Sequence, residues 1–266
     1  MEKRVEQLLR RVGVYAPMKS TTIYETYLRT LRRDVFEARN REIEFYRRTL
    51  AAAGNHGAIF DVGANLGDKA EVFRRVPAKV FCFEPDRTNI KFLRQRFRKR
   101  DDVFVVGKAL NDSAGMLKFN IFQDGDALNT ASTKWVDVLT REEDTRFGMA
   151  KKVATTYEVE AVTLDYVLEQ YGPALYVKID VEGLEVNVLR GLTKRVPFIS
   201  FEANLPEFRA ETLECVSRLA SISPDVKFNY DIDNQMEMPE WMNAEAFSAW
   251  LSNVDKPYME VWAKNL

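Results

Sequence analysis

The sequence contains no long apolar run, a single histidine and only two cysteines among its 266 residues. A membrane-spanning helix needs about 20 consecutive apolar residues, and the apolar runs here are far shorter. The first residues, MEKRVEQLLRRVG, interleave charges where a signal peptide would carry an apolar stretch. These absences predict a soluble, cytoplasmic protein with no transmembrane segment.

The scarcity of histidine and cysteine limits the chemistry available to the chain. His56 lies upstream of the first predicted strand, so it is a poor candidate for a general base. Cys82 and Cys215 sit among apolar neighbours, in VFCF and ETLECVSRL, and we expect both to be buried thiols. Neither occupies a position suited to a nucleophile. Carboxylates are therefore the side chains to consider as a base.

Charge is nearly balanced over the whole chain, at −1, but it is unevenly distributed. The first 50 residues contain 12 basic and 7 acidic residues, and the remainder contains 27 and 33. A net charge near zero argues against a general nucleic-acid binder. The basic excess in the first part either faces solvent or binds an acidic partner.

Residues 21–50 lack glycine and proline, and their apolar side chains are mostly three or four positions apart. This periodicity predicts one or two amphipathic helices. We therefore expect an N-terminal helical segment at residues 1–55, which acts as a lid or in contacts with substrate or with a second copy in a homodimer. Residues 51–57 are typical of a linker.

From residue 56 to residue 266, short β-type runs alternate with helical patterns, which predicts a larger α/β domain. Such alternation is typical of a mainly parallel sheet with helices on both faces. Residues 116–162 interrupt it with two further strands, 116–122 and 155–162, around a polar loop. The predicted strands are 58–62, 79–83, 104–110, 175–179, 198–201, 226–230 and 259–263, and the predicted helices are 87–100, 163–172, 182–192, 206–222 and 243–251.

The first strand runs into a turn, DVGANLG, at the edge where an open α/β sheet binds its ligand. Gly63 and Gly67 let the backbone approach a ligand closely, and Asn65 tolerates the positive φ that a middle glycine would adopt. The three-glycine cradle of dinucleotide-binding proteins is incomplete. Asp61 adds a carboxylate suited to a cationic ligand such as S-adenosylmethionine, although an acid that caps the next helix would give the same pattern.

The second strand ends in Glu84, about twenty residues after the turn, where a carboxylate can accept both hydroxyls of an adenosine ribose. Pro85 ends the strand and begins the loop. Asn111 and Asp112, after the third strand, either contact the adenine or are ordinary turn residues. Together, Asp61 and Glu84 favour S-adenosylmethionine over a nicotinamide cofactor.

Five motifs occur in one order: DVGANLG, FEPD, KALNDSAG, TLDYVL and YVKIDVEGLEVNVLRGL. From Ala58 to Phe201 the sequence thereby resembles the FkbM-type S-adenosylmethionine-dependent methyltransferases. The resemblance implies a class I methyltransferase fold, which is Rossmann-like, with a seven-stranded, mainly parallel sheet and a reversed seventh strand. It also implies S-adenosyl-L-methionine as cofactor, S-adenosyl-L-homocysteine as product, and O-methylation of a hydroxyl on a sugar, glycan or secondary metabolite. The N-terminal helical segment lies outside the resemblance.

Methyl transfer to oxygen requires a group that helps to remove the proton of the hydroxyl nucleophile. Asp180 ends the fourth strand, where the transferred methyl group should lie, and it is our candidate general base. Glu182 begins the next helix and is a second candidate, while Glu202 either orients the acceptor or serves as an alternative base. Lys178 lies on the same side of its strand as Asp180, so it either holds that carboxylate or contacts substrate.

The ends of the fourth and fifth strands invite comparison with the divalent-metal site of catechol-type methyltransferases, because Asp180, Glu202 and Asn204 all offer oxygen ligands. Ala203 interrupts the adjacent Asp-Asn pair of that site, so we expect no metal. Further polar side chains nearby are suited to a polar acceptor such as a sugar. The candidate acceptor contacts are Asn129, Thr130, Ser132, Glu185 and Asn204.

Three other functions share parts of this pattern. An RNA or DNA methyltransferase would use the same donor site, with phosphate contacts from residues 87–100 and from the basic N-terminal segment. The fourth strand, however, lacks the Asn/Asp-Pro-Pro-aromatic turn of enzymes that methylate adenine. An NAD-dependent oxidoreductase is disfavoured by the turn and by Asp61. A non-catalytic partner protein on the same fold would bind the cofactor without turnover.

Overall fold

The computed structural model describes residues 15–54, 57–141 and 150–266, and a mixed sheet forms its centre. Hydrogen-bonded neighbours follow the order β3-β2-β1-β7-β8-β12-β9, and of these seven strands only β12 runs in the opposite direction. The strands are β1 (Ala58–Val62), β2 (Val80–Phe83), β3 (Val103–Val106), β7 (Ala174–Ile179), β8 (Phe198–Asn204), β9 (Lys227–Ile232) and β12 (Tyr258–Lys264). This confirms the predicted class I methyltransferase topology with its reversed last strand. Two short strands, β10 (Gln235–Met236) and β11 (Met242–Asn243), pair with β9 and complete a sheet of nine strands among the described residues.

The register of the sheet decides which polar residues become neighbours. Asp61 of β1 lies opposite Lys178 of β7, and Lys178 lies opposite Ser200 of β8. Farther along, Glu202 of β8 lies opposite Glu260 of β12. Residues in register project to the same face of a sheet, because side chains alternate along each strand. Residues that are far apart in the sequence thus share one face near the carboxyl edge.

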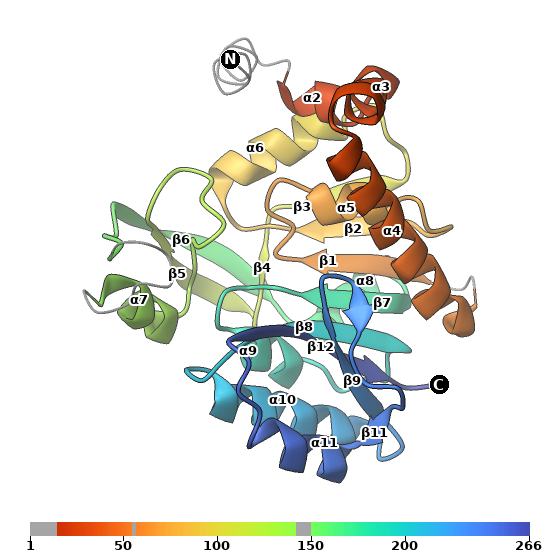
Figure 1. Cartoon of the computed structure of the whole chain (residues 1–266). Coiled ribbons are helices and arrows are strands. Elements are labelled where there is room, and N and C mark those ends of the chain that lie inside the picture. The colour runs from red at the N-terminus through yellow and green to blue at the C-terminus, as the bar shows by residue number, and fades with distance from the viewer. Residues whose placement is uncertain (1–14, 55–56, 142–149) are drawn as a thin grey trace.

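Helices cover both faces of the sheet, as predicted. Figure 1 shows α4, α5 and α6 on one side of it and α9, α10 and α11 on the other. Side-chain caps explain several starts: Asp86, Thr163 and Asn243 each accept backbone N–H groups of the following turn. The helices are α4 (Arg33–Leu50), α5 (Asp68–Phe73), α6 (Arg87–Arg96), α8 (Leu164–Tyr171), α9 (Glu185–Arg190), α10 (Arg209–Ile222) and α11 (Ala244–Leu251).

The amphipathic N-terminal pattern forms two helices, α3 (Thr22–Leu31) and α4, with the break at Arg32. A short helix, α2 (Tyr15–Lys19), precedes them. The apolar face of α4 packs on the sheet, where Tyr46 is fully buried against Phe73 of α5 and Trp262 of β12. Of the predicted linker, Ala51–Ala53 form a 3-10 turn, whereas residues 55–56, and with them His56, lie outside the described residues.

The predicted strand 104–110 is wrong in one respect, because it is two strands in two different sheets. β3 ends at Val106, and the chain turns at Gly107 before β4 (Ala109–Leu110). A Cβ on Gly107 would lie 3.1 Å from the side chain of Ile90 in α6, so the turn follows that helix closely. β4 then leaves the central sheet and pairs with β6 (Thr155–Val162).

The insertion forms a three-stranded second sheet of order β4-β6-β5. β5 (Gly115–Ile121) and β6 pair antiparallel along their whole length, so the predicted pair of extra strands is confirmed. Between them lies a helix that the sequence pattern does not predict, α7 (Thr133–Thr140), and residues 142–149 lie outside the described chain. Ser132 caps α7, and the side chains of Trp135 and Val138 on this helix are buried.

Both cysteines are buried free thiols, as predicted, with Cys82 in β2 and Cys215 in α10. They belong to two separate apolar cores. One lies between the sheet and α4–α5, and the other lies beneath α8–α11. Within the described ranges, no helix has the length and apolar character needed to cross a bilayer.

The turn after β1 approaches the end of β7 more closely than any residue with a side chain would allow. Gly63 has a φ of +85°, and a Cβ built on it would lie 1.7 Å from the carbonyl oxygen of Asp180. The N–H of Asp180 also donates to the carbonyl of Val62 (2.9 Å). Glycine is therefore required here for packing of backbone on backbone.

Replacing Gly63 with alanine should destabilise the protein, because the new methyl group meets a backbone atom that cannot move aside independently. We expect the free energy of unfolding to fall by about 2 kcal/mol or more, as measured by urea or thermal denaturation. Gly115→Ala is the matched control, since nothing lies within 4 Å of its added Cβ. Equal stability of the two variants would contradict the close approach.

Candidate active site

The main cavity lies at the carboxyl ends of β1, β2 and β7, the edge at which the sequence predicts a ligand. One wall comprises the turn after β1, the tip of β2 and residues 180–182. The second sheet and its loop supply an apolar wall that is suited to a flat aromatic base. Its residues include Ala109, Leu110, Leu117, Phe119 and Ala127.

Backbone hydrogen bonds hold the turn after β1 against the tip of β2. The N–H groups of Gly63 and Ala64 donate to the carbonyl of Phe83 (2.9 and 3.1 Å). Asn65 has a φ of +46°, which confirms that it adopts the positive φ expected of it. Its N–H donates to a carboxylate oxygen of Glu84 (2.7 Å), so the turn and the tip form one unit.

Glu84 lies on the cavity wall beside Pro85, and it is 4% exposed. Its two oxygens accept the N–H groups of Asn65 and Asp86, each at 2.7 Å. Burial raises the pKa of Glu84 to about 8 despite these hydrogen bonds. Each oxygen has a further lone pair that can accept a hydrogen bond from a hydroxyl group, and the proton that the raised pKa favours can be donated to one. This arrangement fits an adenosine ribose.

Asp61 lies behind the cavity wall and does not line it. It is 1% exposed, and neither of its oxygens has a hydrogen-bond partner among the described residues. Burial raises its pKa to about 6, although the neighbouring Lys178 lowers it. The structure therefore does not bring Asp61 into the predicted direct contact. An unpartnered negative charge one residue from the wall still fits a cationic group in the cavity.

Three other predicted donor residues also lie outside the cavity lining. Gly67 has a φ of +75°, and a Cβ on it would lie 2.6 Å from Leu93, so it allows α6 to pack against the turn. Asn111 donates to Asp112, which accepts in turn from Asn187 of α9. These two residues face α9 because β4 carries the chain out of the central sheet. The position of Asn111 and Asp112 therefore does not support the predicted contact with adenine.

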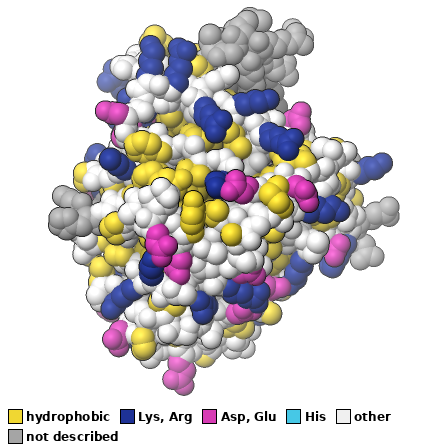
Figure 2. Space-filling model, turned by 180° about the vertical axis from the view of Figure 1, so that it is seen from behind, with side chains coloured by type: hydrophobic (Ala, Val, Ile, Leu, Met, Phe, Trp, Pro, Cys, Tyr) yellow, Lys and Arg dark blue, Asp and Glu magenta, His cyan; other side chains and the backbone are white. Residues whose placement is uncertain are grey.

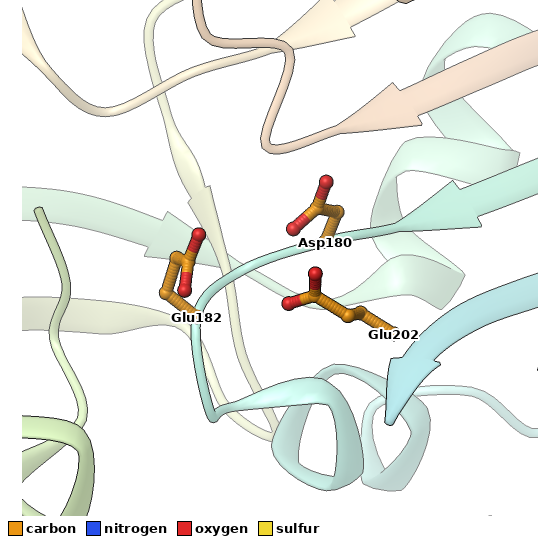
Figure 3. A group of neighbouring side chains, drawn as sticks. All are labelled: Asp180, Glu182 and Glu202. Atoms are coloured by element: carbon orange, nitrogen blue, oxygen red, sulfur yellow. The ribbon is translucent and has the colours of Figure 1, made fainter. Parts of the chain in front are cut away.

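Three carboxylates meet beside the cavity, and we call Asp180, Glu182 and Glu202 the carboxylate cluster. Figure 3 shows the first two on the loop after β7 and the third on β8, and one oxygen of each lies within 4.8 Å of the others. Burial and the neighbouring carboxylates raise the pKa values of Glu182 and Glu202 well above the ordinary range. Asn204 donates to Glu202 (2.8 Å), so it orients a member of the cluster.

Lys178 is a buried cation that forms an ion pair with Asp180 of the carboxylate cluster. It is 2% exposed, and its ammonium donates to Asp180 at 2.7 Å. Burial lowers the pKa of Lys178, but the carboxylates of Asp180, Glu260 and Asp61 outweigh this and raise it well above its ordinary value. Of the two roles considered for Lys178, the geometry favours holding Asp180, because a buried ammonium has no open path to substrate.

The loop that carries Glu182 has an unusual backbone, with a φ of +56° at that residue. The hydroxyl of Thr130 donates to the carbonyl of Glu182 (2.8 Å). Glu185 accepts the N–H groups of Val181 and Gly183 (3.1 and 3.2 Å), and burial raises its pKa to about 7. Thr130 and Glu185, predicted as acceptor contacts, therefore hold the loop that presents Glu182.

Two further predicted acceptor contacts are engaged within the fold. Ser132 caps α7 by accepting the N–H of Trp135 (3.1 Å). Asn129 lines the cavity, but its amide donates to Asp86 (2.8 Å) and accepts the N–H of Phe122 (2.9 Å). Both side chains stabilise the insertion, and their contact with an acceptor is not supported by these bonds.

Two residues of the site were missed from the sequence. Asn89 lines the cavity at 2% exposure, and its Oδ1 accepts no hydrogen bond within the described chain. The helix-start pattern after Glu84 was a usable signal, since Asp86 accepts the N–H of Asn89 (3.1 Å). Glu260 lies near Lys178 but comes from β12, and no local motif connects the two.

The carboxylate cluster offers the oxygen ligands that hard divalent cations prefer. Lys178 already pairs with Asp180, and Asn204 already donates to Glu202. Activity without a metal therefore stays our prediction.

A family model described as the methyltransferase FkbM domain matches residues 61–243. The chain belongs to the FkbM methyltransferase family. It is therefore an S-adenosylmethionine-dependent methyltransferase, as the resemblance from Ala58 to Phe201 implied, and the match extends through β11. The unpartnered Asp61 and the wall formed by Gly63, Asn65 and Glu84 fit this cofactor.

The solved structures to which this FkbM protein is similar include three that carry the name of a methyltransferase, and all three have low identity to it. The plantazolicin methyltransferase BpumL in complex with SAH is 9% identical, with a TM-score of 0.40 over 99% of this chain and 100% of that one. Precorrin-6y C5,15-methyltransferase from Geobacter metallireducens is 12% identical, with a TM-score of 0.39 over 83% and 87%. An SAM-dependent O-methyltransferase from Thermotoga maritima is 11% identical, with a TM-score of 0.35 over 79% and 60%. No curated protein matches the chain significantly.

Glu84→Ala should weaken the binding of S-adenosylhomocysteine by roughly 10- to 100-fold, or about 1.5 to 3 kcal/mol, because hydrogen bonds from ribose hydroxyls to a carboxylate are lost. Isothermal titration calorimetry measures the change. Glu158→Ala is the control, since that glutamate is exposed on β6. Glu84 also holds the turn after β1, so an analogue of S-adenosylhomocysteine without ribose hydroxyls is used to separate the two roles. If the loss comes from the ribose hydrogen bonds, this analogue should bind the wild type and Glu84→Ala with equal affinity. Unchanged affinity for S-adenosylhomocysteine in Glu84→Ala would exclude the ribose contact.

Proposed function

We propose that this enzyme is an O-methyltransferase that acts on a hydroxyl group of a sugar, glycan or secondary metabolite. The carboxylate cluster is the observation that carries the proposal. Carboxyl groups whose oxygens lie within 4.8 Å of one another can bind neighbouring hydroxyl groups of one acceptor. An alcohol nucleophile must also lose its proton, and a carboxylate beside the cavity can accept it.

Asp180 is the general base in this proposal. It lines the cavity, and the ammonium of Lys178 holds its carboxylate in place. Burial and the neighbouring carboxylates raise the pKa values of Glu182 and Glu202, which favours their protonated forms and suits them to orienting the acceptor rather than to taking its proton. Lys178 acts through Asp180 and is a positioning residue.

The donor side of the proposal uses Gly63, Asn65, Glu84 and Pro85 on the cavity wall. S-adenosylmethionine supplies an activated methyl group when it is bound there. The protein's own residues then align the acceptor oxygen and remove its proton. We assign these tasks to a methyltransferase domain at residues 56–266, and we keep residues 1–55 as a separate helical segment.

Asp180→Asn should lower kcat by about 10²- to 10⁴-fold, because the amide cannot accept the hydroxyl proton. Affinity for S-adenosylhomocysteine should change by less than about threefold, since the donor wall is intact. Asp112→Asn is the matched control, because Asp112 lies outside the cavity, and both measured quantities should stay at their wild-type values. An equal loss of turnover and donor affinity in Asp180→Asn would make Asp180 a binding residue.

The acceptor class is best identified by transfer of a labelled methyl group from S-adenosylmethionine into a fractionated extract of the source cells. We expect label in carbohydrate, lipid-glycan or small-metabolite fractions that survives nuclease and mild base, with or without EDTA. Asp180→Asn is the negative control. Label only in RNA, DNA or protein would overturn the O-methylation proposal, and loss of all label with EDTA would overturn the prediction of metal-independence.

Nucleic acid is the second candidate acceptor, on the strength of one surface. The exposed side of α6 and the turn after it carries Arg87, Lys91, Arg94, Arg98 and Lys99, none of which forms an ion pair with a described residue. Figure 2 shows Lys and Arg side chains gathered toward the end of the molecule that carries α2, α3 and α6. A basic surface that only faces solvent explains the same observation. Nuclease treatment in the labelling experiment distinguishes the two, because it removes label from a nucleic-acid acceptor.

The predicted cytoplasmic location and a homodimer through the N-terminal helices also belong to this proposal. Exposed Ile23 and Leu31 on α3 are compatible with contacts between copies. Cell fractionation and size-exclusion chromatography with light scattering test the two predictions separately.

A further inference from the structure

A second hollow lies between the N-terminal helices and the methyltransferase domain. We call it the seam pocket, and it encloses about 210 Å³. It is bordered by residues 19–22, Glu25, Arg39 of α4, Glu71, Arg74, Arg75 and Arg100. It has no lining residue in common with the main cavity. A ligand bound here would therefore be distinct from methyl donor and acceptor.

The border of the seam pocket is rich in cations. Lys19, Arg39, Arg74, Arg75 and Arg100 all line it, against the two carboxylates of Glu25 and Glu71. Both carboxylates are engaged: Glu25 pairs with Arg75 (3.4 Å), and Glu71 accepts from Ser20 (2.8 Å) and Arg74 (3.0 Å). The lining thus carries three positive charges more than negative ones.

Two further aspartates reduce this excess but do not remove it. Asp68 pairs with Lys19 (2.8 Å) and Asp102 with Arg74 (3.3 Å). Arg39 makes no ion pair with any residue of the described chain. Burial lowers the pKa of Lys19, and although Asp68 opposes this, the nearby Arg96 and Arg39 lower it further. The region therefore retains an uncompensated positive charge.

One buried donor at the border lacks an acceptor. The Nε of Arg75 is buried and makes no hydrogen bond with a described residue, whereas the Nε of Arg74 lies 3.3 Å from the carboxylate of Asp102. A buried guanidinium N–H without an acceptor is costly and calls for a bound water or ion. The excess of positive charge favours an anion over a neutral ligand.

The N-terminus of α3 also favours an anion in the seam pocket. Thr21 caps this ten-residue helix. The first turn of the helix borders the seam pocket through Thr22 and Glu25. The positive end of a helix dipole and the N–H groups of the first turn favour an anion. Arginine forks match the oxygen geometry of phosphate groups.

From these contacts we propose that the seam pocket binds a phosphate group, either free phosphate or the phosphate of a small metabolite. The bound anion bridges Arg39 of the N-terminal helices and the arginines at residues 74–75 of the methyltransferase domain. It thereby clamps the two parts of the chain together.

Isothermal titration calorimetry of the full chain with inorganic phosphate, in buffer matched to each injection for ionic strength with chloride, tests the proposal. Arg39→Ala should weaken phosphate binding at least fivefold, and Arg39→Lys should recover part of the affinity. Arg41→Ala is the matched control, because it removes the same charge from an exposed position of α4 that does not line the seam pocket, and it should bind phosphate as the wild type does.

Titration with glycerol phosphate separates the two sources of the phosphate group. Tighter binding of the ester than of inorganic phosphate indicates a phosphorylated metabolite, and the reverse order indicates the free ion. Absence of binding beyond that of chloride overturns the proposal, as does an equal loss in Arg39→Ala and Arg41→Ala. Circular dichroism confirms that each variant is folded, so that a loss of binding is not a loss of structure.

Discussion

The buried ammonium of Lys178 holds together acids that three different strands bring to the carboxyl edge of the sheet. Asp61 comes from β1, Asp180 follows β7, and Glu260 comes from β12. A lysine buried alone would lose its charge, whereas these carboxylates preserve it. The ammonium in turn fixes Asp180 at 2.7 Å on the cavity wall. The acids still outnumber the cation, which suits a site for a positively charged methyl donor and for hydroxyl groups that donate hydrogen bonds.

Unusual backbone conformations surround the cavity, and each is supported by a neighbour. Asn65 and Glu182 have positive φ values, and so do Gly63 and Gly183. Glu84 receives the N–H of Asn65, and the hydroxyl of Thr130 reaches the carbonyl of Glu182. Strain of this kind persists only where the surroundings compensate for it. The second sheet therefore supports the reactive loop as well as covering the cavity.

The N-terminal helices are joined to the donor site through Arg96, whose side chain is fully buried. Its Nη1 donates to the carbonyl of Leu66 in the turn after β1 (2.6 Å), and its Nε donates to the hydroxyl of Ser20 beside the seam pocket (3.3 Å). One guanidinium group thus contacts both the turn after β1 and the border of the seam pocket. Packing of Tyr46 on Trp262 anchors the same helices from the other end.

The sequence by itself determined most of the order of strands and helices, the turn at Gly63 and Asn65, the position of Glu84 and the candidate base Asp180, because each depends on residues close together in the chain. Only the tertiary structure decided that Asp61 lies behind the wall, that Glu185 and Ser132 support loops, and that Asn111 faces α9. It also brought Glu260 to Lys178 and the basic residues of α4 to those that follow α5. These outcomes depend on strand register and on packing between distant segments, which local periodicity does not encode.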